Sequence, residues 1–192
     1  GGLAGLTAAL LAAKSGARVI LADEQNEFGG WLLGETDTFI DGLTPADWTA
    51  SVIAELAAMP EVTLLPRTTI FGYMDHNYLT LVERVTDHME ARPAHLPRQR
   101  LYKVRASQVI LAQGAHERPL VFSGNDLPGV MLSGAVRTYI NRFGVLPGNR
   151  SVVFTNNDDA YRTALALHDA GAHVVLVDLR RDVKGDLIKA VR

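Results

Sequence analysis

Along the first part of the chain, the spacing of apolar residues is that of a helix, then of a strand, then of a second helix. Residues 3–15 are rich in Ala and Leu, contain no Pro and precede Gly16, which predicts a helix with a glycine stop. The β-branched run 17–22 predicts a short, buried parallel strand. Residues 46–58 predict a second helix, with Asp47 at its start and a Pro soon after its end.

The middle of the chain changes to shorter apolar runs. Residues 62–65 and 69–73 are strand candidates. Residues 78–89 and 100–105 alternate as antiparallel strands do, and the Pro-rich stretch 91–99 predicts the loop between them. A buried strand is predicted again at residues 107–112, with the sequence SQVILA.

A second strand–helix–strand unit follows. A Gly- and Pro-rich link, 118–129, leads to a predicted helix at 133–143. The remaining predicted elements are a strand at 151–155, a helix at 158–170 and a strand at 173–177 that ends in Asp178. This order predicts an α/β fold, with a Rossmann-like FAD/NAD(P)-binding domain and its antiparallel excursion at residues 1–130. The start of a second Rossmann-like unit is expected at residues 131–192.

Composition narrows the functional classes. The 192 residues carry a net charge of −2, which favours neither nucleic acid nor an anionic membrane as partner. The absence of Cys excludes disulfides, thiolate zinc sites and redox dithiols, and no apolar run reaches membrane-spanning length. We expect a cytoplasmic protein. The start at Gly1 without a preceding strand, and the stop at Arg192, lead us to expect an internal piece that lacks the first strand of its sheet.

Glycines at the first helix supply the first chemical motif. A dinucleotide fold uses a Gly-rich turn so that backbone approaches the pyrophosphate and the helix packs closely on its strand. Gly2 and Gly5 fit the second and third positions of this motif, and the first position would precede Gly1. The alternative is a glycine-rich linker that enters a helix.

An acid at the end of the next strand favours nucleotide binding. Asp23 stands where a carboxylate accepts hydrogen bonds from a ribose hydroxyl, and the neighbouring Glu24 is the alternative acceptor. A carboxylate here favours NAD or FAD over NADP, because it would repel a 2′-phosphate. The alternative is a solvated acid at a strand end.

The turn of the second unit lacks this motif. Asn156 and Asn157 occupy positions where a pyrophosphate needs glycine, and Asp158 and Asp159 add two negative charges. We expect both acids to cap the following helix and the unit to lack a classical pyrophosphate site. The histidines form no pair with ligand spacing, so no metal site is predicted.

Two further glycine-containing segments resemble motifs of a known family. The run from Asp23 to Gly29-Gly30 resembles the acid-then-double-glycine signature of two-dinucleotide-domain flavoproteins. Gln113-Gly114-Ala115 resembles the turn that closes their first domain, with Gln113 where Thr is usual. Arg118, three positions on, is placed to contact a phosphate or to pair with a carboxylate.

A narrower resemblance covers nearly the whole chain. The runs 67–77, 114–145 and 151–165 closely resemble the α subunit of heterotetrameric sarcosine oxidase. Related opine-oxidising, cyanide-forming and proline-oxidising subunits share the outline less closely. Ile70 lies in the first of these runs and is counted with the residues expected to bind the cofactor.

The resemblance implies a role within a complex. That family oxidatively demethylates sarcosine to glycine and forms hydrogen peroxide, with FAD on the β subunit, FMN at the α/β contact and NAD on the α subunit. It implies that this chain binds NAD, with FAD as the alternative, that other subunits are its partners and that it carries no catalytic residue. Competing hypotheses are an FAD-dependent pyridine-nucleotide reductase, a related amino-acid or opine dehydrogenase subunit, and a structural subunit with a vacant nucleotide fold.

Overall fold

The computed structural model describes residues 1–191, and the chain forms two compact units. The first unit is Gly1–Gly114 and the second begins at Ala115. Each unit has its own hydrophobic core. The compact units divide at Gly114, and the ligand-binding domain boundary expected after residue 130 stays a prediction.

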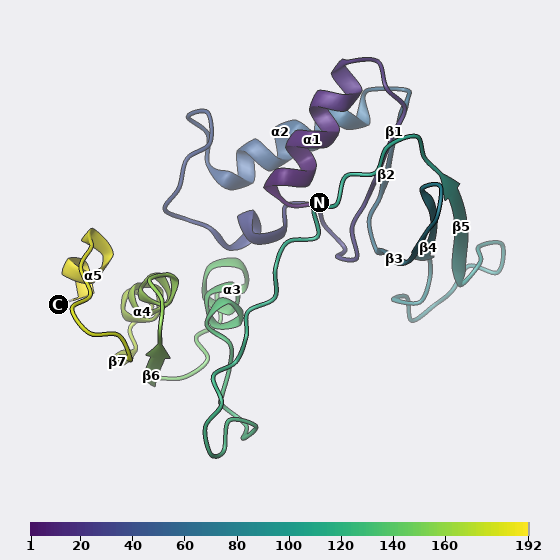
Figure 1. The fold of residues 1–192 in the computed structure, drawn as a ribbon. Helices are drawn as coiled ribbons and strands as arrows, with labels where there is room; N and C mark the ends of the chain where they lie inside the picture. Colours follow the sequence, from purple (N-terminus) through teal and green to yellow (C-terminus); the bar gives the residue numbers. More distant parts are fainter. Residues whose placement is uncertain (192) are drawn as a thin grey trace. The chain divides into compact units, whose positions relative to one another are not determined.

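The first unit begins with two helices that pack against each other beside a parallel strand pair (Figure 1). The elements are α1 (Leu3–Lys14), β1 (Val19–Ala22), α2 (Pro45–Ala57) and β2 (Val62–Leu65). β1 pairs with β2 in parallel, from Val19 opposite Val62 to Ala22 opposite Leu65. The core beneath the helices consists of Leu6, Ala9, Phe28, Leu32, Trp48, Val52 and Leu56.

Two local features of this part differ from the sequence expectation. The cap of α2 is Thr44, whose hydroxyl oxygen accepts the Asp47 N–H at 3.2 Å, while the Asp47 carboxylate accepts the Thr44 hydroxyl at 2.7 Å. A short 3-10 helix, η1 (Gly30–Gly34), follows the double glycine and was not predicted. It forms where Leu32 packs into the core, a long-range contact that local periodicity does not encode.

An antiparallel sheet completes the first unit. It consists of β3 (Thr68–Met74), β4 (Tyr78–Arg84) and β5 (Gln99–Arg105), in the order β3-β4-β5. The strand predicted to run to residue 89 is wrong in its second part. The N–H groups of Val85 and Thr86 both donate to the carbonyl of Arg98, so regular pairing ends and the chain turns away.

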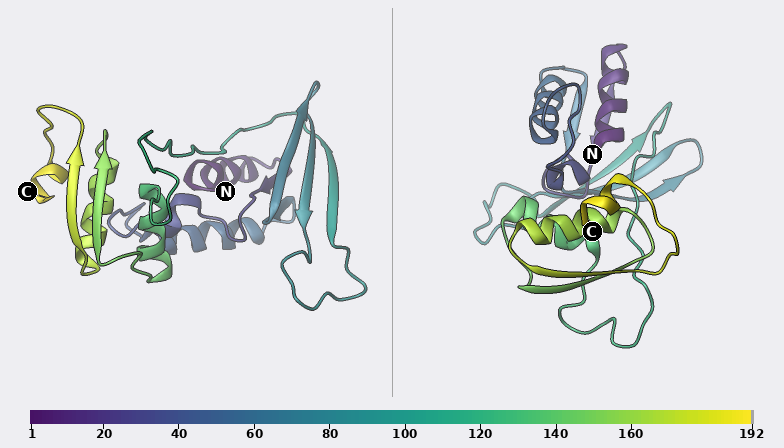
Figure 2. Two further views of the ribbon diagram at one scale, coloured as in Figure 1. Left: turned by 90° about the horizontal axis from the view of Figure 1, so that it is seen from below. Right: turned by 90° about the vertical axis from the view of Figure 1, so that its left-hand side faces the viewer.

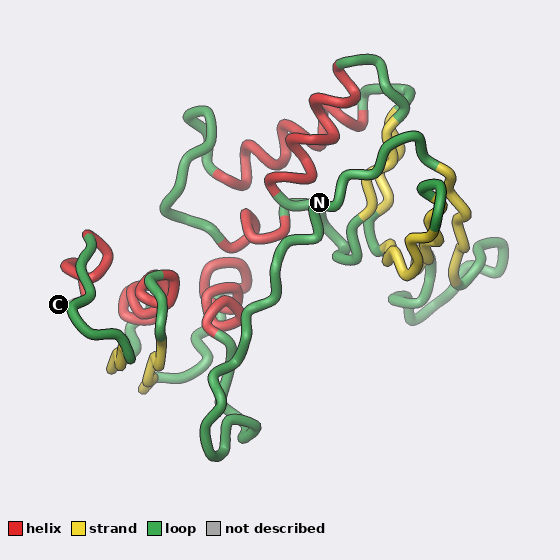
Figure 3. The backbone as a smooth tube through the Cα atoms, viewed as in Figure 1, coloured by secondary structure: helices red, strands yellow, loops and turns green. Residues whose placement is uncertain are grey.

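The strand predicted at residues 107–112 does not form, and Figure 3 shows this stretch as loop. Within residues 1–191, no strand lies beside it to accept its backbone hydrogen bonds. Ile110 and Leu111 therefore stay 66% and 63% exposed despite their strand-like sequence. The reason is tertiary, because a strand exists only with a neighbour.

The second unit is a smaller strand–helix–strand body. Its elements are α3 (Ser133–Phe143), β6 (Arg150–Thr155), α4 (Asp159–Asp169), β7 (His173–Asp178) and the unpredicted short helix α5 (Asp186–Val191). Figure 2 shows β6 and β7 side by side with α4 along them, and the two strands pair in parallel from Arg150 opposite His173. The expected α/β class, with parallel pairs and an antiparallel excursion, is confirmed. Within the described residues, no helix is long and apolar enough to cross a membrane.

Candidate functional site

The amino-terminal end of α1 leaves its first backbone donors free. Gly2 precedes the helix in an extended conformation, and no side chain caps the first turn. The Leu6 N–H donates to the Gly2 carbonyl at 2.9 Å, whereas the amides of residues 3–5 meet no acceptor in the described part of the chain. The first turn also carries no acid. A helix end in this state attracts an anion through its free N–H groups and partial positive charge.

The carboxylate of Asp23 lies beside this glycine turn. Its Oδ2 is 2.8 Å from the Gly1 amine, and its Oδ1 accepts the Gln25 N–H at 2.8 Å. The backbone of Asp23 is held at the end of β1, where its N–H donates to the Leu65 carbonyl at 3.0 Å. The parallel pairing of β1 therefore places Asp23 at the carboxyl end of the strands, where Rossmann-like folds bind ligands.

The double glycine closes the same turn from the other side. The Gly29 N–H donates to the Gly1 carbonyl at 2.8 Å, and Gly2 and Gly29 form a parallel bridge. Gly30 has a φ of +54°, and a Cβ there would lie 3.0 Å from the Gly2 Cα. Glycine is required at this position both for its left-handed backbone and for the close approach of the two segments.

Gly5 lies where α1 packs closely on its neighbours. It is buried, and a Cβ built on it would stand 3.5 Å from the Ala112 Cβ and 3.9 Å from the Leu21 Cδ1. These are ordinary contact distances, so the space holds a methyl group but no larger branch. Gly5 therefore matches the third glycine of a dinucleotide turn, whose role is close packing of helix and strand.

The structure does not place the other predicted site residues in this turn. Glu24 follows β1 with an exposed side chain, and Ile70 lies in the antiparallel sheet opposite Leu81, 46% exposed. Gly114 ends the first unit with a φ of +73°. Ala115 and Arg118 belong to the second unit. The structure thus brings together Gly2, Gly5, Asp23, Gly29 and Gly30, and the ligand contacts of all ten residues stay predictions.

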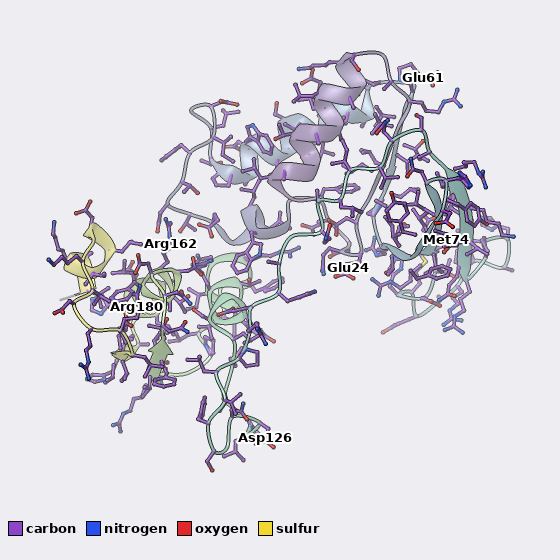
Figure 4. The ribbon with its side chains drawn as sticks, in the orientation of Figure 1. Glu24, Glu61, Met74, Asp126, Arg162 and Arg180 are labelled. Carbon is purple, nitrogen blue, oxygen red and sulfur yellow. The ribbon has the colours of Figure 1, made fainter. Side chains whose placement is uncertain are left out.

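Sequence reasoning missed two arginines beside this site. Arg67 and Arg84 line a cavity of about 320 Å³ next to the loop after β1, where Figure 4 labels Glu24. The Arg84 Nη2 donates to the Glu24 carbonyl at 2.7 Å. No local pattern in the sequence predicts this contact, because the partners are 60 positions apart and meet only in the fold.

In the second unit, side chains bind to one another at the turn between β6 and α4. Asp158 is the N-cap residue of α4 and Asp159 lies in the first turn, as expected, but neither side chain makes a capping hydrogen bond. The Asn157 Oδ1 accepts the Asp159 N–H at 3.0 Å. The two acids form ion pairs instead. Asp158 pairs with Arg180 at 2.7 Å, and Asp159 pairs with the buried Arg137 at 3.0 Å.

The acid at the end of β7 is also occupied. The Oδ2 of Asp178 accepts the Tyr161 hydroxyl at 3.0 Å and the Arg180 Nη2 at 2.7 Å. Its Oδ1 accepts the Arg180 backbone N–H at 2.9 Å. The hydrogen-bonded guanidinium of Arg180, labelled in Figure 4, holds the pKa of Asp178 well below its ordinary range. Two side chains, those of Tyr161 and Arg180, therefore occupy the Asp178 carboxylate, whereas the Asp23 carboxylate meets only backbone groups in the described part of the chain.

Comparison with known proteins first defines the class. Residues 1–65 match the family model described as an NAD(P)-binding Rossmann-like domain. This stretch contains α1, β1, the double glycine and Asp23. The fold of this stretch is therefore that of an NAD(P)-binding Rossmann-like domain.

The chain as a whole is similar to one particular subunit. It is 51% identical over 93% of its length to sarcosine oxidase subunit alpha of Rhizobium meliloti (strain 1021). It is 47% identical over 99% of its length to the subunit of the same name from Corynebacterium sp. (strain P-1). The resemblance inferred from the residues is confirmed. The chain spans 18% and 20% of the length of these two relatives.

A solved structure supports the fold. L-proline dehydrogenase from P. horikoshii superposes with a TM-score of 0.73 at 22% identity, over 97% of this chain and 35% of that one. At this identity the similarity concerns the fold. The order and arrangement of helices and strands in this chain therefore also occur in a solved structure.

Proposed function

We propose that this chain is the dinucleotide-binding part of an α-type subunit in a hetero-oligomeric amine oxidase, and that it holds NAD. The observation that carries the proposal is that Asp23 follows the end of β1 and its carboxylate lies directly beside Gly1 of the glycine turn. The free amides at the start of α1 receive the pyrophosphate. Asp23 accepts hydrogen bonds from the ribose hydroxyls, and a second acid, Glu24, follows it directly.

The nucleotide chemistry of this site follows from charge. A carboxylate that accepts from vicinal hydroxyls excludes a 2′-phosphate by repulsion, so the proposal favours NAD over NADP. FAD is the alternative occupant, since its adenosine end offers the same ribose. In either case, the residues of this chain bind and orient the nucleotide.

The oxidation itself is proposed to take place elsewhere in the complex. The similarity to subunits named for sarcosine oxidase supports sarcosine as the substrate of the complex. Glycine and hydrogen peroxide as products, with FAD and FMN bound outside this chain, are part of the same proposal. The second unit is proposed to be structural, because Asn157 caps its turn and Arg180 holds Asp178.

The test is the identity of the nucleotide that the full-length protein releases on denaturation. We expect a ligand with the mass of NAD, besides the FAD and FMN proposed for the rest of the complex. Loss of FAD rather than of NAD in Asp23→Ala protein would overturn the choice of NAD and keep the site. If Asp23→Ala protein, shown to be folded by circular dichroism, released the same nucleotide in the same amount as the wild type, the site itself would be wrong.

A further inference from the structure

A short hairpin, residues 37–43, lies in the loop that leads into α2 (Figure 1). The Ile40 N–H donates to the Leu43 carbonyl at 3.0 Å, and the Leu43 N–H donates to the Ile40 carbonyl at 2.9 Å. Asp41 and Gly42 form the turn between them, with φ of +52° and +79°. Positive φ at both central residues is what a tight two-residue hairpin turn requires. The 37–43 hairpin is therefore a defined structure.

The hairpin is anchored through one side chain and exposes the next. Ile40 packs against the core beneath α1 and α2. The preceding residue, Phe39, is 71% exposed. Successive side chains of an extended segment point to opposite sides, so a buried Ile40 turns Phe39 toward solvent. The hairpin thus holds one aromatic ring away from the surface, on a backbone that is already fixed.

Two further apolar side chains of the same stretch are exposed. Trp31 in η1 is 49% exposed, and Leu43 in the hairpin is 42% exposed. A single exposed apolar residue is ordinary on a protein surface, whereas aromatic residues are enriched at the centres of protein interfaces. A backbone fixed in advance also loses less entropy on binding. Phe39 is therefore suited to enter an apolar pocket of another protein.

The charge around the hairpin restricts the partner. Every charged side chain between Arg18 and Arg67 is an Asp or a Glu, and this stretch has no His. Asp37 and Asp41 are exposed and stand two positions to either side of Phe39. These acids repel a nucleic acid, an anionic lipid surface and an acidic protein face. A basic protein surface is the complement.

We infer that the 37–43 hairpin is a docking surface for another protein subunit, and that Phe39 enters an apolar pocket with a rim of Lys or Arg side chains. The inference rests on the proposed function, which supplies the hetero-oligomer to which that subunit belongs. Asp37 and Asp41 face the basic rim. The Thr36 hydroxyl donates to the Asp37 Oδ1 at 3.0 Å and so orients this carboxylate on the hairpin.

The first test replaces Phe39 by the photo-cross-linking residue p-benzoylphenylalanine in the full-length protein, purified with the other subunits of its complex. Irradiation joins this residue to whatever it contacts, and mass spectrometry identifies the peptide. We expect a cross-link to another subunit, in a segment that carries Lys or Arg. A cross-link to a second copy of this chain or to another segment of the same chain would overturn the inference, and so would the absence of any protein cross-link.

The second test measures the association of the full-length protein with the other subunits. Phe39→Ser should weaken association by about thirtyfold, the loss typical of a central aromatic residue. Phe39→Leu keeps an apolar side chain and should retain most of the affinity. Asp41→Asn removes a charge but keeps the turn, because Asn tolerates positive φ. Its effect should be largest at low salt and shrink as the salt concentration rises.

Leu11→Ser is the matched control, because Leu11 is 65% exposed on α1, outside the hairpin. It should leave the association unchanged. Wild-type affinity in Phe39→Ser protein would overturn the inference, and so would an equal loss in Leu11→Ser protein. The NAD released by the same samples shows whether each variant is folded. Wild-type complexes that depend on Phe39 but release no NAD would contradict the proposed nucleotide and leave the docking surface standing.

Discussion

We propose that nucleotide selectivity depends on Asp23. Its carboxylate lies beside the glycine turn, fixed by the end of β1 and by the Gln25 N–H at 2.8 Å. Asp23→Asn removes the charge that repels a 2′-phosphate, while the neighbouring Arg67 and Arg84 remain. We expect weaker NAD binding and a smaller preference over NADP, measured by titration of the full-length protein with both nucleotides.

Glu24→Gln is the control for this prediction, because Glu24 is the other acid at the strand end. It should keep the wild-type preference. If instead Glu24→Gln changes the preference and Asp23→Asn does not, Glu24 is the residue that accepts from the ribose.

Substitutions of Gly5 test how closely α1 packs on its neighbours. The 3.5 Å from a Cβ at Gly5 to the Ala112 Cβ leaves room for a methyl group and for nothing larger. Gly5→Val should therefore push the helix from its neighbours and abolish nucleotide retention, whereas Gly5→Ala should retain most of it. The nucleotide content of the purified, folded variants decides the matter, and equal content in Gly5→Val and wild type would contradict the prediction.

At the scale of elements, the stretch at residues 107–112 is the weak part of the first unit. Its backbone lacks a strand partner in residues 1–191, and Ile110 and Leu111 are mostly exposed. Because Ala112 lies against Gly5, a poorly held stretch loosens one wall of the nucleotide turn. We expect the 192-residue chain by itself to retain no stoichiometric nucleotide. Nucleotide that co-purifies with it at one mole per mole would show the opposite.

The end of β7 gives a prediction for pH. The folded pKa of Asp178 is depressed, so its pairing with Arg180 stabilises the second unit above the unfolded pKa of about 3.9. That contribution is lost as the pH falls through the folded pKa. Arg180→Gln should lower the Tm of the chain near neutral pH, and the difference should shrink on acidification below about pH 4.

The exposed neighbour Arg181 provides the control for this measurement. Arg181→Gln should leave the Tm unchanged across the same pH range. A Tm difference for Arg180→Gln that stays constant into strong acid would mean that Arg180 stabilises through packing rather than through Asp178.

For the whole molecule, the proposed function separates nucleotide binding from oxidation. Oxidation of a secondary amine needs a flavin beside the substrate, and the proposal places that flavin outside this chain. The sequence supplies no Cys for redox chemistry. We therefore expect no hydrogen peroxide when the 192-residue chain alone is mixed with sarcosine in air. A peroxide signal above that of heat-denatured chain would overturn this assignment.

Several elements could be predicted because their signals are local. Residues 133–143 and 62–65 form the helix and strand that their periodicity indicates, with the same bounds. Gly2, Gly5 and Asp23 could be chosen as a set because the spacing of a glycine turn, a helix and a strand fixes where the acid comes to lie. The resemblance to sarcosine oxidase α subunits could be recognised from the sequence alone, because it depends on similar residues and not on the fold.

Other features were decided only by the tertiary structure. Residues 107–112 have a strand sequence but no strand, because pairing depends on a neighbour and not on propensity. The side chain of Asn157, and not that of the N-cap residue Asp158, accepts the Asp159 N–H, while Arg180 and Arg137 from distant positions pair with the two acids. The Arg67–Arg84 cavity arises where two hairpin residues meet the loop after β1. The sequence by itself determined the turn, the helix and the acid, and only the fold determined which charged groups stay open to a ligand.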